Sequence, residues 1–241
     1  MYSYILFDLD GTLTDPKLGI TKSVQHALRA FGIEEDNLDK LEPFIGPPLL
    51  GSFMEFYGFS KEQGLAAIAK YREYFSVKGL YENEMYCGIP ELLKKLKDAG
   101  CRLAVASSKP TEFVLKIMDH FDIAQYFDCI LGSEMDGSVR GTKEEVVEEV
   151  LRRLVPNWDE THPEHWVDLR VEERKAQVQR GVQTPEIAMV GDRKFDIQGA
   201  RAFGLVAVAV SYGYAQGNEL AEEGADAIAA TVEELGEILL K

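Results

Sequence analysis

Cysteine is scarce in this chain of 241 residues, which contains only Cys87, Cys101 and Cys129. The three lie far apart without CxxC spacing, and two of them fall in or beside apolar stretches typical of strands. This pattern argues against a disulfide framework and indicates buried thiols in a reducing compartment.

Basic residues are also few: 26 Lys and Arg stand against 41 Asp and Glu, which gives a net charge of −15. No basic tract offsets this acidity, so we expect neither a nucleic-acid polymer nor a membrane surface as partner. The chain reaches Asp8 after a few apolar residues without a basic leader, so neither a signal peptide nor a membrane span is expected. A cytoplasmic location follows from these absences.

The chain is rich in alternating apolar segments, and 46% of its residues are hydrophobic. From residue 88 onward, β-prone runs alternate with runs of helical periodicity. The predicted strands are 4–7, 103–106, 129–131, 187–190 and 206–210, and the predicted helices are 89–99, 111–121, 143–154, 195–203 and one from 232. This alternation predicts an α/β fold, a Rossmann-like three-layer core with a parallel sheet covered on both faces.

Residues 16–82 lack this alternation and contain no convincing strand. Apolar residues at helical spacing predict a helix over 20–31 that ends at Gly32, and the helical pattern continues to about residue 77. Turns interrupt it at the Gly46-Pro47-Pro48 sequence and at Gly58. We therefore expect a helical domain at 16–82, inserted after the first strand into a core formed by 1–15 and 83–241.

A polar stretch from 156 to 185 delays the strand expected after the helix over 143–154. Residues 171–180 could supply a helix, and Trp158 and Trp166 could attach the stretch to the core. His162 and His165 have a spacing that can bind metal on a helix, but Pro163 stands between them, so a surface excursion is the preferred interpretation.

Asp8 and Asp10 follow the first strand, at the carboxyl end where open α/β sheets bind their ligands. Alternation along an extended chain lets both carboxylates point the same way. Two like charges so close repel unless a cation or a proton intervenes, which indicates a bound divalent metal.

Polar side chains also follow three other predicted strands. Ser107, Ser108 and Lys109 form a turn before a helix, where hydroxyl and backbone N–H groups can bind phosphate. Lys143 begins a helix, although a cation there opposes the helix dipole, and such exceptions often have a functional reason. Asp192 follows the strand over 187–190, and Asp196 lies one helical turn later.

In combination, these residues resemble the signatures of the haloacid dehalogenase-like phosphohydrolases. The matching elements, in order, are DLDGT at 8–12, Ser107, Lys143 and GDRKFD at 191–196. Within that family the sequences DLDGTLTDPKLGI, IGPPL and VASSKP are most similar to the phosphoglycolate phosphatase and nucleotidase-like branch. The resemblance covers nearly the whole chain and implies a helical cap inserted after the first signature.

The resemblance implies an enzyme, a Mg²⁺-dependent phosphomonoester hydrolase. Asp8 would be the nucleophile that forms an aspartyl-phosphate, and Asp10 the general acid and base. The Asp8 side chain, the Asp10 carbonyl and Asp192 would bind Mg²⁺. Ser107 and Lys143 would hold the phosphoryl oxygens, and Asp196 would orient Lys143 or a metal-bound water.

Substrate recognition is less explicit in the sequence. The resemblance places Gly46, Pro47 and Pro48 in a substrate-facing loop of the cap, and Ser108, Lys109 and Gly46 are the candidate substrate-binding residues. Lys109 and Arg193 are interpreted either as cations that attract anions to the site or as surface charges. Lys17, Lys22 or a cap aromatic residue are further candidates for reading the substrate.

The expected partner is a small phosphate ester: a nucleoside monophosphate, phosphoglycolate or a sugar phosphate. The chain is expected to be a monomer or a homodimer. A phosphomutase of the β-phosphoglucomutase type and a non-catalytic member of the fold remain alternatives. A dehalogenase is disfavoured because Asp10 is present. A phosphonatase would require a Schiff-base lysine in the helical domain, for which Lys22 and Lys40 are the candidates.

Overall fold

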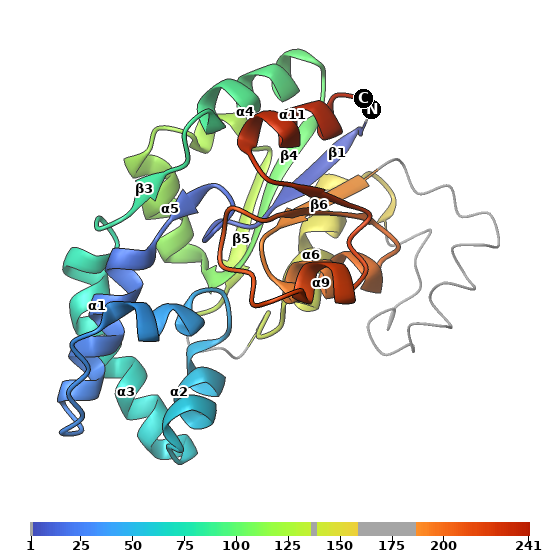
Figure 1. The fold of residues 1–241 in the computed structure, drawn as a ribbon. Coiled ribbons are helices and arrows are strands. Elements are labelled where there is room, and N and C mark those ends of the chain that lie inside the picture. Colours follow the sequence, from blue (N-terminus) through green and yellow to red (C-terminus); the bar gives the residue numbers. More distant parts are fainter. Residues whose placement is uncertain (1, 136–138, 159–186) are drawn as a thin grey trace.

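The computed structural model describes residues 2–135, 139–158 and 187–241. Its central feature is a six-stranded sheet in the order β5-β4-β1-β6-β7-β8 (Figure 1). All neighbouring strands in it are parallel. The strands are β1 (Tyr4–Phe7), β4 (Arg102–Pro110), β5 (Cys129–Ser133), β6 (Ile187–Gly191), β7 (Val206–Val210) and β8 (Ala227–Ala229).

Both faces of the sheet are buried, because side chains alternate along each strand. In β1, Ile5 and Phe7 belong to one apolar cluster and Leu6 to the other, and all three are fully buried. Helices α4 (Ile89–Asp98), α5 (Thr111–His120) and α11 (Val232–Leu239) contribute to the first cluster. Helices α6 (Lys143–Leu154), α9 (Lys194–Ala202) and α10 (Glu219–Glu222) contribute to the second. The predicted three-layer α/β fold is confirmed.

Between β1 and α4 the chain forms a group of helices that extends away from the sheet (Figure 1). This helical segment, residues 17–79, contains α1 (Lys17–Arg29), η1 (Leu38–Phe44), α2 (Leu49–Tyr57), α3 (Lys61–Tyr74) and η2 (Phe75–Gly79). Its apolar residues, among them Val24, Phe53 and Phe75, share the first cluster with the strands. The segment is therefore packed against the sheet through a continuous core.

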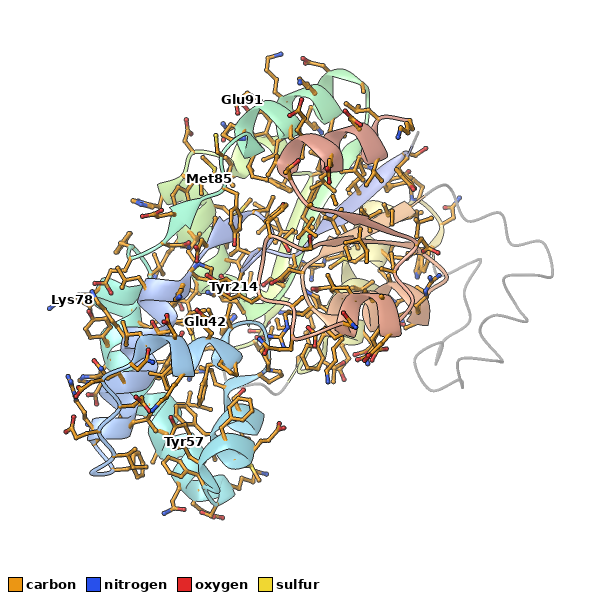
Figure 2. All side chains as sticks on the ribbon, in the orientation of Figure 1. Glu42, Tyr57, Lys78, Met85, Glu91 and Tyr214 are labelled. Carbon is orange, nitrogen blue, oxygen red and sulfur yellow. The ribbon has the colours of Figure 1, made fainter. Side chains whose placement is uncertain are left out.

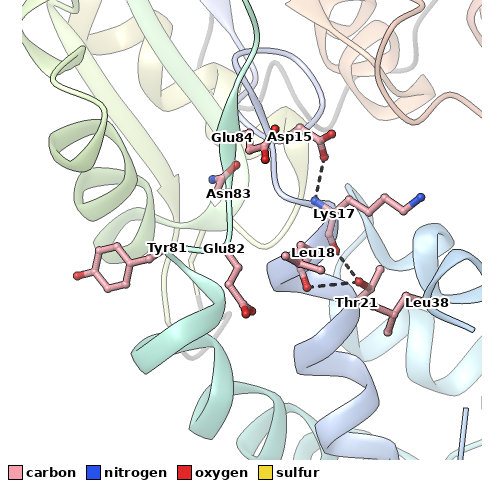
Figure 3. Close-up of a pocket in the computed structure, with 9 residues that line it drawn as sticks. All are labelled: Asp15, Lys17, Leu18, Thr21, Leu38, Tyr81, Glu82, Asn83 and Glu84. Carbon is pink, nitrogen blue, oxygen red and sulfur yellow. Dashed lines mark hydrogen bonds between the residues drawn. The ribbon is translucent and has the colours of Figure 1, made fainter. Parts of the chain in front are cut away.

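The chain crosses between sheet and helical segment at two adjacent places. Strand β2 (Thr14–Asp15) pairs antiparallel with β3 (Glu84–Met85), so the outgoing and returning chains are joined. Helix α1 begins at Lys17, three residues before the predicted start at residue 20, and the Asp15 carboxylate accepts a hydrogen bond of 3.0 Å from the Lys17 N–H (Figure 3). A cavity of about 330 Å³ lies beside these crossings.

Other departures from the predicted elements are local. Residues 107–109, expected as a turn, continue β4 in extended form, with a register shift between Ala106 and Pro110. Strands β2, β3 and β8 and helix α10 were not predicted. In the described residues, no helix has the length and apolar character needed to span a membrane.

Most of the 156–185 stretch, with His162, His165, Trp166 and the helix predicted at 171–180, lies outside the described residues. Trp158 is buried, and its ring centroid lies 6.4 Å from that of Phe203 at the end of α9. The first part of the stretch is thus attached by this tryptophan, as expected, to the sheet and its covering helices, which together are called the sheet domain below.

Candidate active site

Lys143 connects two carboxylates at the carboxyl end of the sheet. Its ammonium group donates to Asp8 Oδ1, to Asp196 Oδ1 and to the Ala106 carbonyl, each at 2.7 Å. These three bonds use all the donors of an ammonium group. Burial alone would lower the pKa of Lys143, but the Asp196 and Asp8 carboxylates outweigh it and raise that pKa above its usual value.

The position of Lys143 at the start of α6 has a local explanation. The Thr142 hydroxyl accepts from the Glu145 N–H, and the Glu145 carboxylate accepts from the Thr142 N–H, so a capping box forms the helix N-terminus. The carboxylates of Asp8 and Asp196 offset the unfavourable dipole interaction of the lysine. The helix start thus delivers a fixed cation to the end of β1.

Asp8, Asp192 and Asp196 form a compact carboxylate cluster, with one oxygen of each lying within 4.8 Å of the others. Burial, together with repulsion from Asp196 and Asp8, raises the pKa of Asp192 well above its usual range. Burial also raises the pKa of Asp196 to about 6, against the opposing effect of Lys143. The lysine therefore compensates only part of the negative charge gathered here.

Asp192 Oδ1 is buried without a hydrogen-bond partner among the described residues. The other oxygen of this carboxylate accepts from the Tyr214 N–H at 2.7 Å. A buried carboxylate oxygen with no donor is costly unless a cation binds it. Carboxylate oxygens are the ligands that Mg²⁺ and Ca²⁺ prefer, so the cluster fits a hard divalent cation.

The turn after β1 brings Asp10 close to this cluster. Gly11 has a φ of +80°, and a Cβ atom there would lie 2.1 Å from Asp192 Oδ2. Only glycine therefore allows the turn to approach Asp192 this closely. The Tyr214 hydroxyl donates to Asp15 in the same region, and Figure 2 shows Tyr214 where the strands meet the helical segment.

Asp10 is paired with Lys109, whose ammonium group lies 2.6 Å from Asp10 Oδ2 and 2.8 Å from Oδ1. Burial raises the pKa of Asp10, and Lys109 opposes the rise. The Lys109 side chain is 7% exposed, and its ammonium group lies 4.8 Å from the Phe75 ring centroid. The interpretation of Lys109 as a surface charge is therefore wrong.

A cavity of about 710 Å³ opens between Asp10 and the helical segment. Its walls are mainly apolar, with Phe44, Tyr71, Phe75 and Phe113 as the aromatic members. Gly46, Ser108 and Lys109, the three candidate substrate-binding residues, all line it. The candidate substrate-binding residues therefore share this cavity with Asp10, whereas Asp8, Ser107, Lys143, Asp192 and Asp196 do not line it.

The remaining candidates lie in different surroundings. Ser107 is buried within β4, next to Ala106, and its hydroxyl accepts from the Lys109 N–H at 3.4 Å. Lys22 pairs with Glu82 at 2.6 Å, and Lys40 with Glu35 at 3.0 Å. Lys17 pairs with Asp39 and Glu42. These three lysines are thus held by carboxylates of the helical segment and the returning chain.

The interpretation of Arg193 as a surface charge is also wrong, because it is 5% exposed. Its guanidinium group donates to Glu219 at 2.7 Å and to the Ile45 carbonyl. The sequence does not predict Tyr214 and Glu219 as neighbours of the site. Their contacts join residues far apart along the chain, and no local pattern indicates them.

Residues 5–210 match the haloacid dehalogenase-like hydrolase family, and the chain belongs to that family. A 5'-nucleotidase of Pseudomonas aeruginosa is 43% identical over 219 residues, which cover 91% of this chain and 87% of that protein. The tyrosine-protein kinase PtkA of Mycobacterium tuberculosis is 36% identical over 239 residues, covering 98% and 72%. The crystal structure of a predicted phosphatase from Clostridium acetobutylicum is 41% identical, with a TM-score of 0.83 and coverage of 100% and 99%.

These matches confirm the family expected from the combination of Asp8, Ser107, Lys143 and Asp192. They also confirm the expected class of enzyme, a phosphatase. The structural match over the whole chain includes both the sheet and the helical segment.

Proposed function

We propose that the protein is a Mg²⁺-dependent phosphomonoester hydrolase in which Asp8 is the nucleophile. The observation that carries this proposal is the position of Asp8, which lies at the end of β1 in contact with Lys143 and in the carboxylate cluster. A carboxylate that a cation holds in place at the carboxyl end of a sheet is already oriented to attack an electrophile, so the carboxylate need not move.

The donor set supports a metal ion at the same place. We propose that the Asp8 side chain, Asp192 and the backbone carbonyl of Asp10 hold Mg²⁺, with Asp196 in a supporting role. When bound, the ion would neutralise the carboxylates and the charge on the phosphoryl oxygens. Asp192 Oδ1, which has no hydrogen-bond partner in the part of the chain that the structure describes, is the atom that most needs such a ligand.

The side chains account for both halves of hydrolysis. In the first half, an Asp8 oxygen forms a bond to phosphorus as the ester P–O bond breaks, and Asp10 gives its proton to the leaving oxygen. In the second, Asp10 takes a proton from water, whose oxygen attacks phosphorus and releases Asp8 and inorganic phosphate. The raised pKa of Asp10 favours a carboxyl group that can carry this proton.

Ser107 and Lys143 would hold the phosphoryl oxygens during both steps, with Lys143 exchanging its bond to Asp8 for one to a phosphoryl oxygen. Lys143 already has its ammonium group at Asp8, so it can neutralise charge that develops beside the nucleophile. The Lys143 ammonium group donates to the carbonyl of Ala106, and Ser107 is the next residue along the chain, so both side chains lie at the same point along β4. Asp196 fixes the lysine from the other side.

The helical segment would act as a cap, with bounds of 16–82 against a core of 1–15 and 83–241. Closing over the site, it would exclude water in the first step. Cavities of roughly 300–1,000 Å³ take drug-sized ligands, so the cavity of about 710 Å³ beside Asp10 suits a bulky leaving group. The aromatic lining favours a nucleoside monophosphate over phosphoglycolate, in keeping with the relative named 5'-nucleotidase.

The other expectations fit this function. The substrate would be a small molecule of the cytoplasm rather than a nucleic-acid polymer, and the chain would act as a monomer or a homodimer.

A panel of phosphate esters assayed for phosphate release tests the proposal. The panel holds nucleoside monophosphates, sugar phosphates and phosphoglycolate, each with and without Mg²⁺. We expect Mg²⁺-dependent release that is fastest with nucleoside monophosphates. Isomerisation of a sugar phosphate without phosphate release would support the phosphomutase instead, and inactivity across the panel would support a non-catalytic protein.

A further inference from the structure

Arg193 joins the sheet domain to the helical segment beside the cavity. It follows Asp192 directly, and its Nε donates to Glu219 Oε1 at 2.7 Å. Its Nη1 donates to the backbone carbonyl of Ile45, which ends η1 in the helical segment. One guanidinium group thus bonds a residue of α10 and a residue 148 positions earlier in the chain.

The loop at 45–48 is packed directly on this arginine. Gly46 has a φ of +101°, and a Cβ atom there would lie 2.9 Å from Arg193 Cγ and 3.2 Å from Nη1. The absence of a side chain therefore lets the loop lie on the arginine stem. Gly46, Pro47 and Pro48 all line the 710 Å³ cavity, so the arginine supports a wall of that cavity.

The buried bonds of Arg193 to Glu219 and Ile45 contribute more to the orientation of the 45–48 loop than to the stability of the fold. The Arg193 and Glu219 side chains are only 6% and 10% exposed, and removing such a pair from water costs much of what their attraction returns. The rigid fork of a guanidinium group, however, fixes two acceptors in one geometry. A contact of this kind holds the 45–48 loop in one position at modest net gain in stability.

We propose that Arg193 is a positioning residue that holds the 45–48 loop against the sheet domain and so sets the shape of the cavity around the leaving group. The inference rests on the proposed function, because it assumes that the leaving group lies in that cavity. Since Arg193 follows Asp192, the turn that presents a candidate metal ligand also holds the loop that faces the substrate.

Arg201 offers a matched control in α9, the helix that begins directly after Arg193. Its guanidinium group donates to Asp226 at 2.8 Å and to the Gly224 carbonyl, so it too bonds one carboxylate and one backbone oxygen. Both partners of Arg201 belong to the sheet domain, whereas one partner of Arg193 belongs to the helical segment. The two arginines differ in burial, so stability is measured for both variants.

The test compares Arg193→Met, Arg193→Lys and Arg201→Met in the full chain. Hydrogen exchange is followed in the peptide covering residues 41–53, without substrate. We expect exchange in this peptide to accelerate by ~10-fold or more in Arg193→Met and not in Arg201→Met. Arg193→Lys keeps the charge but cannot reach both acceptors, so it should retain wild-type stability and show an intermediate acceleration.

Kinetics with a nucleoside monophosphate give the second readout. We expect Arg193→Met to raise KM about tenfold while kcat falls less, because the loop shapes binding and does not touch the phosphoryl group. Exchange that is unchanged in the 41–53 peptide, or equally faster in all peptides, would overturn the proposal. If Arg193→Met does not fold, the same comparison with Arg193→Lys decides. A wild-type chain without phosphatase activity would refute the proposed function, while the exchange result would still decide the loop contact.

Discussion

The carboxyl end of the sheet and the wall that the helical segment contributes to the 710 Å³ cavity meet near Asp10 but are built on different principles. At the sheet, Asp8, Lys143 and Asp196 are buried and joined by ion pairs of 2.7 Å. The wall is mainly apolar, with aromatic residues such as Phe44 and Tyr71. Fixed charges suit a reaction at phosphorus, which is the same for every ester, whereas an apolar wall can be reshaped for different leaving groups. The carboxyl end of the sheet would therefore determine the reaction, and the apolar wall would determine which substrate is accepted.

The distinction between the two regions would fail most clearly if the reaction did not take place at the carboxyl end of the sheet. Asp8→Asn should reduce kcat at least ~10³-fold, because it removes the nucleophile. Phosphate release from a nucleoside monophosphate measures this. Asp98→Asn is the control, since Asp98 is an exposed carboxylate paired with Lys94. Activity of Asp8→Asn within a few fold of wild type would contradict the assignment.

Loss of Lys143 should affect both activity and stability. Lys143→Met leaves Asp8 and Asp196 buried without their cation, so we expect a loss of about 3 kcal/mol in unfolding free energy and ~10²-fold in kcat. Urea unfolding and steady-state kinetics measure the two effects. Lys22→Met is the control: its pair with Glu82 is partly exposed and worth about 1 kcal/mol at most. Equal losses in the two variants would argue against a special role for Lys143.

Metal binding should stabilise the folded chain through Asp192. At a Mg²⁺ concentration of about 100 times Kd, the unfolding free energy should rise by about 2.7 kcal/mol. In Asp192→Asn this rise should disappear, which thermal unfolding with and without Mg²⁺ measures. A Mg²⁺ effect that survives in Asp192→Asn would place the ion elsewhere.

The smallest effect is expected at the wall. Tyr71→Leu keeps an apolar side chain but removes an aromatic ring from the cavity, so KM for a nucleoside monophosphate should rise roughly 3–10-fold with kcat nearly unchanged. KM for phosphoglycolate should change less. A fall in kcat as large as that of Lys143→Met would contradict the distinction between the two regions.

The sequence predicts the strand positions well because both faces of the sheet are buried, which produces apolar runs such as residues 4–7 and 206–210. It also predicts that Asp8, Lys143 and Asp192 meet, because the carboxyl ends of parallel strands share one edge. The two-residue strands β2 and β3 are too short to show any periodicity.

The burial of Lys109 and Arg193 was missed for another reason. Lys109 is buried by Asp10, which lies 99 positions away, and Arg193 by Ile45, which lies 148 positions away. Local sequence carries no record of such partners, and an isolated charged residue is exposed in most proteins. Residues 107–109, expected as a polar turn, are extended, and pairing with β5 resumes directly after them between Pro110 and Ser133.

The central claim is that the carboxylate of Asp8 carries the phosphoryl group. It is tested most directly by mixing the enzyme and Mg²⁺ with a phosphate-labelled nucleoside monophosphate, quenching in acid within one turnover, and locating protein-bound label. We predict that label appears transiently on the peptide containing Asp8 and is absent in Asp8→Asn. Label on another residue, or label that persists in Asp8→Asn, would contradict the account.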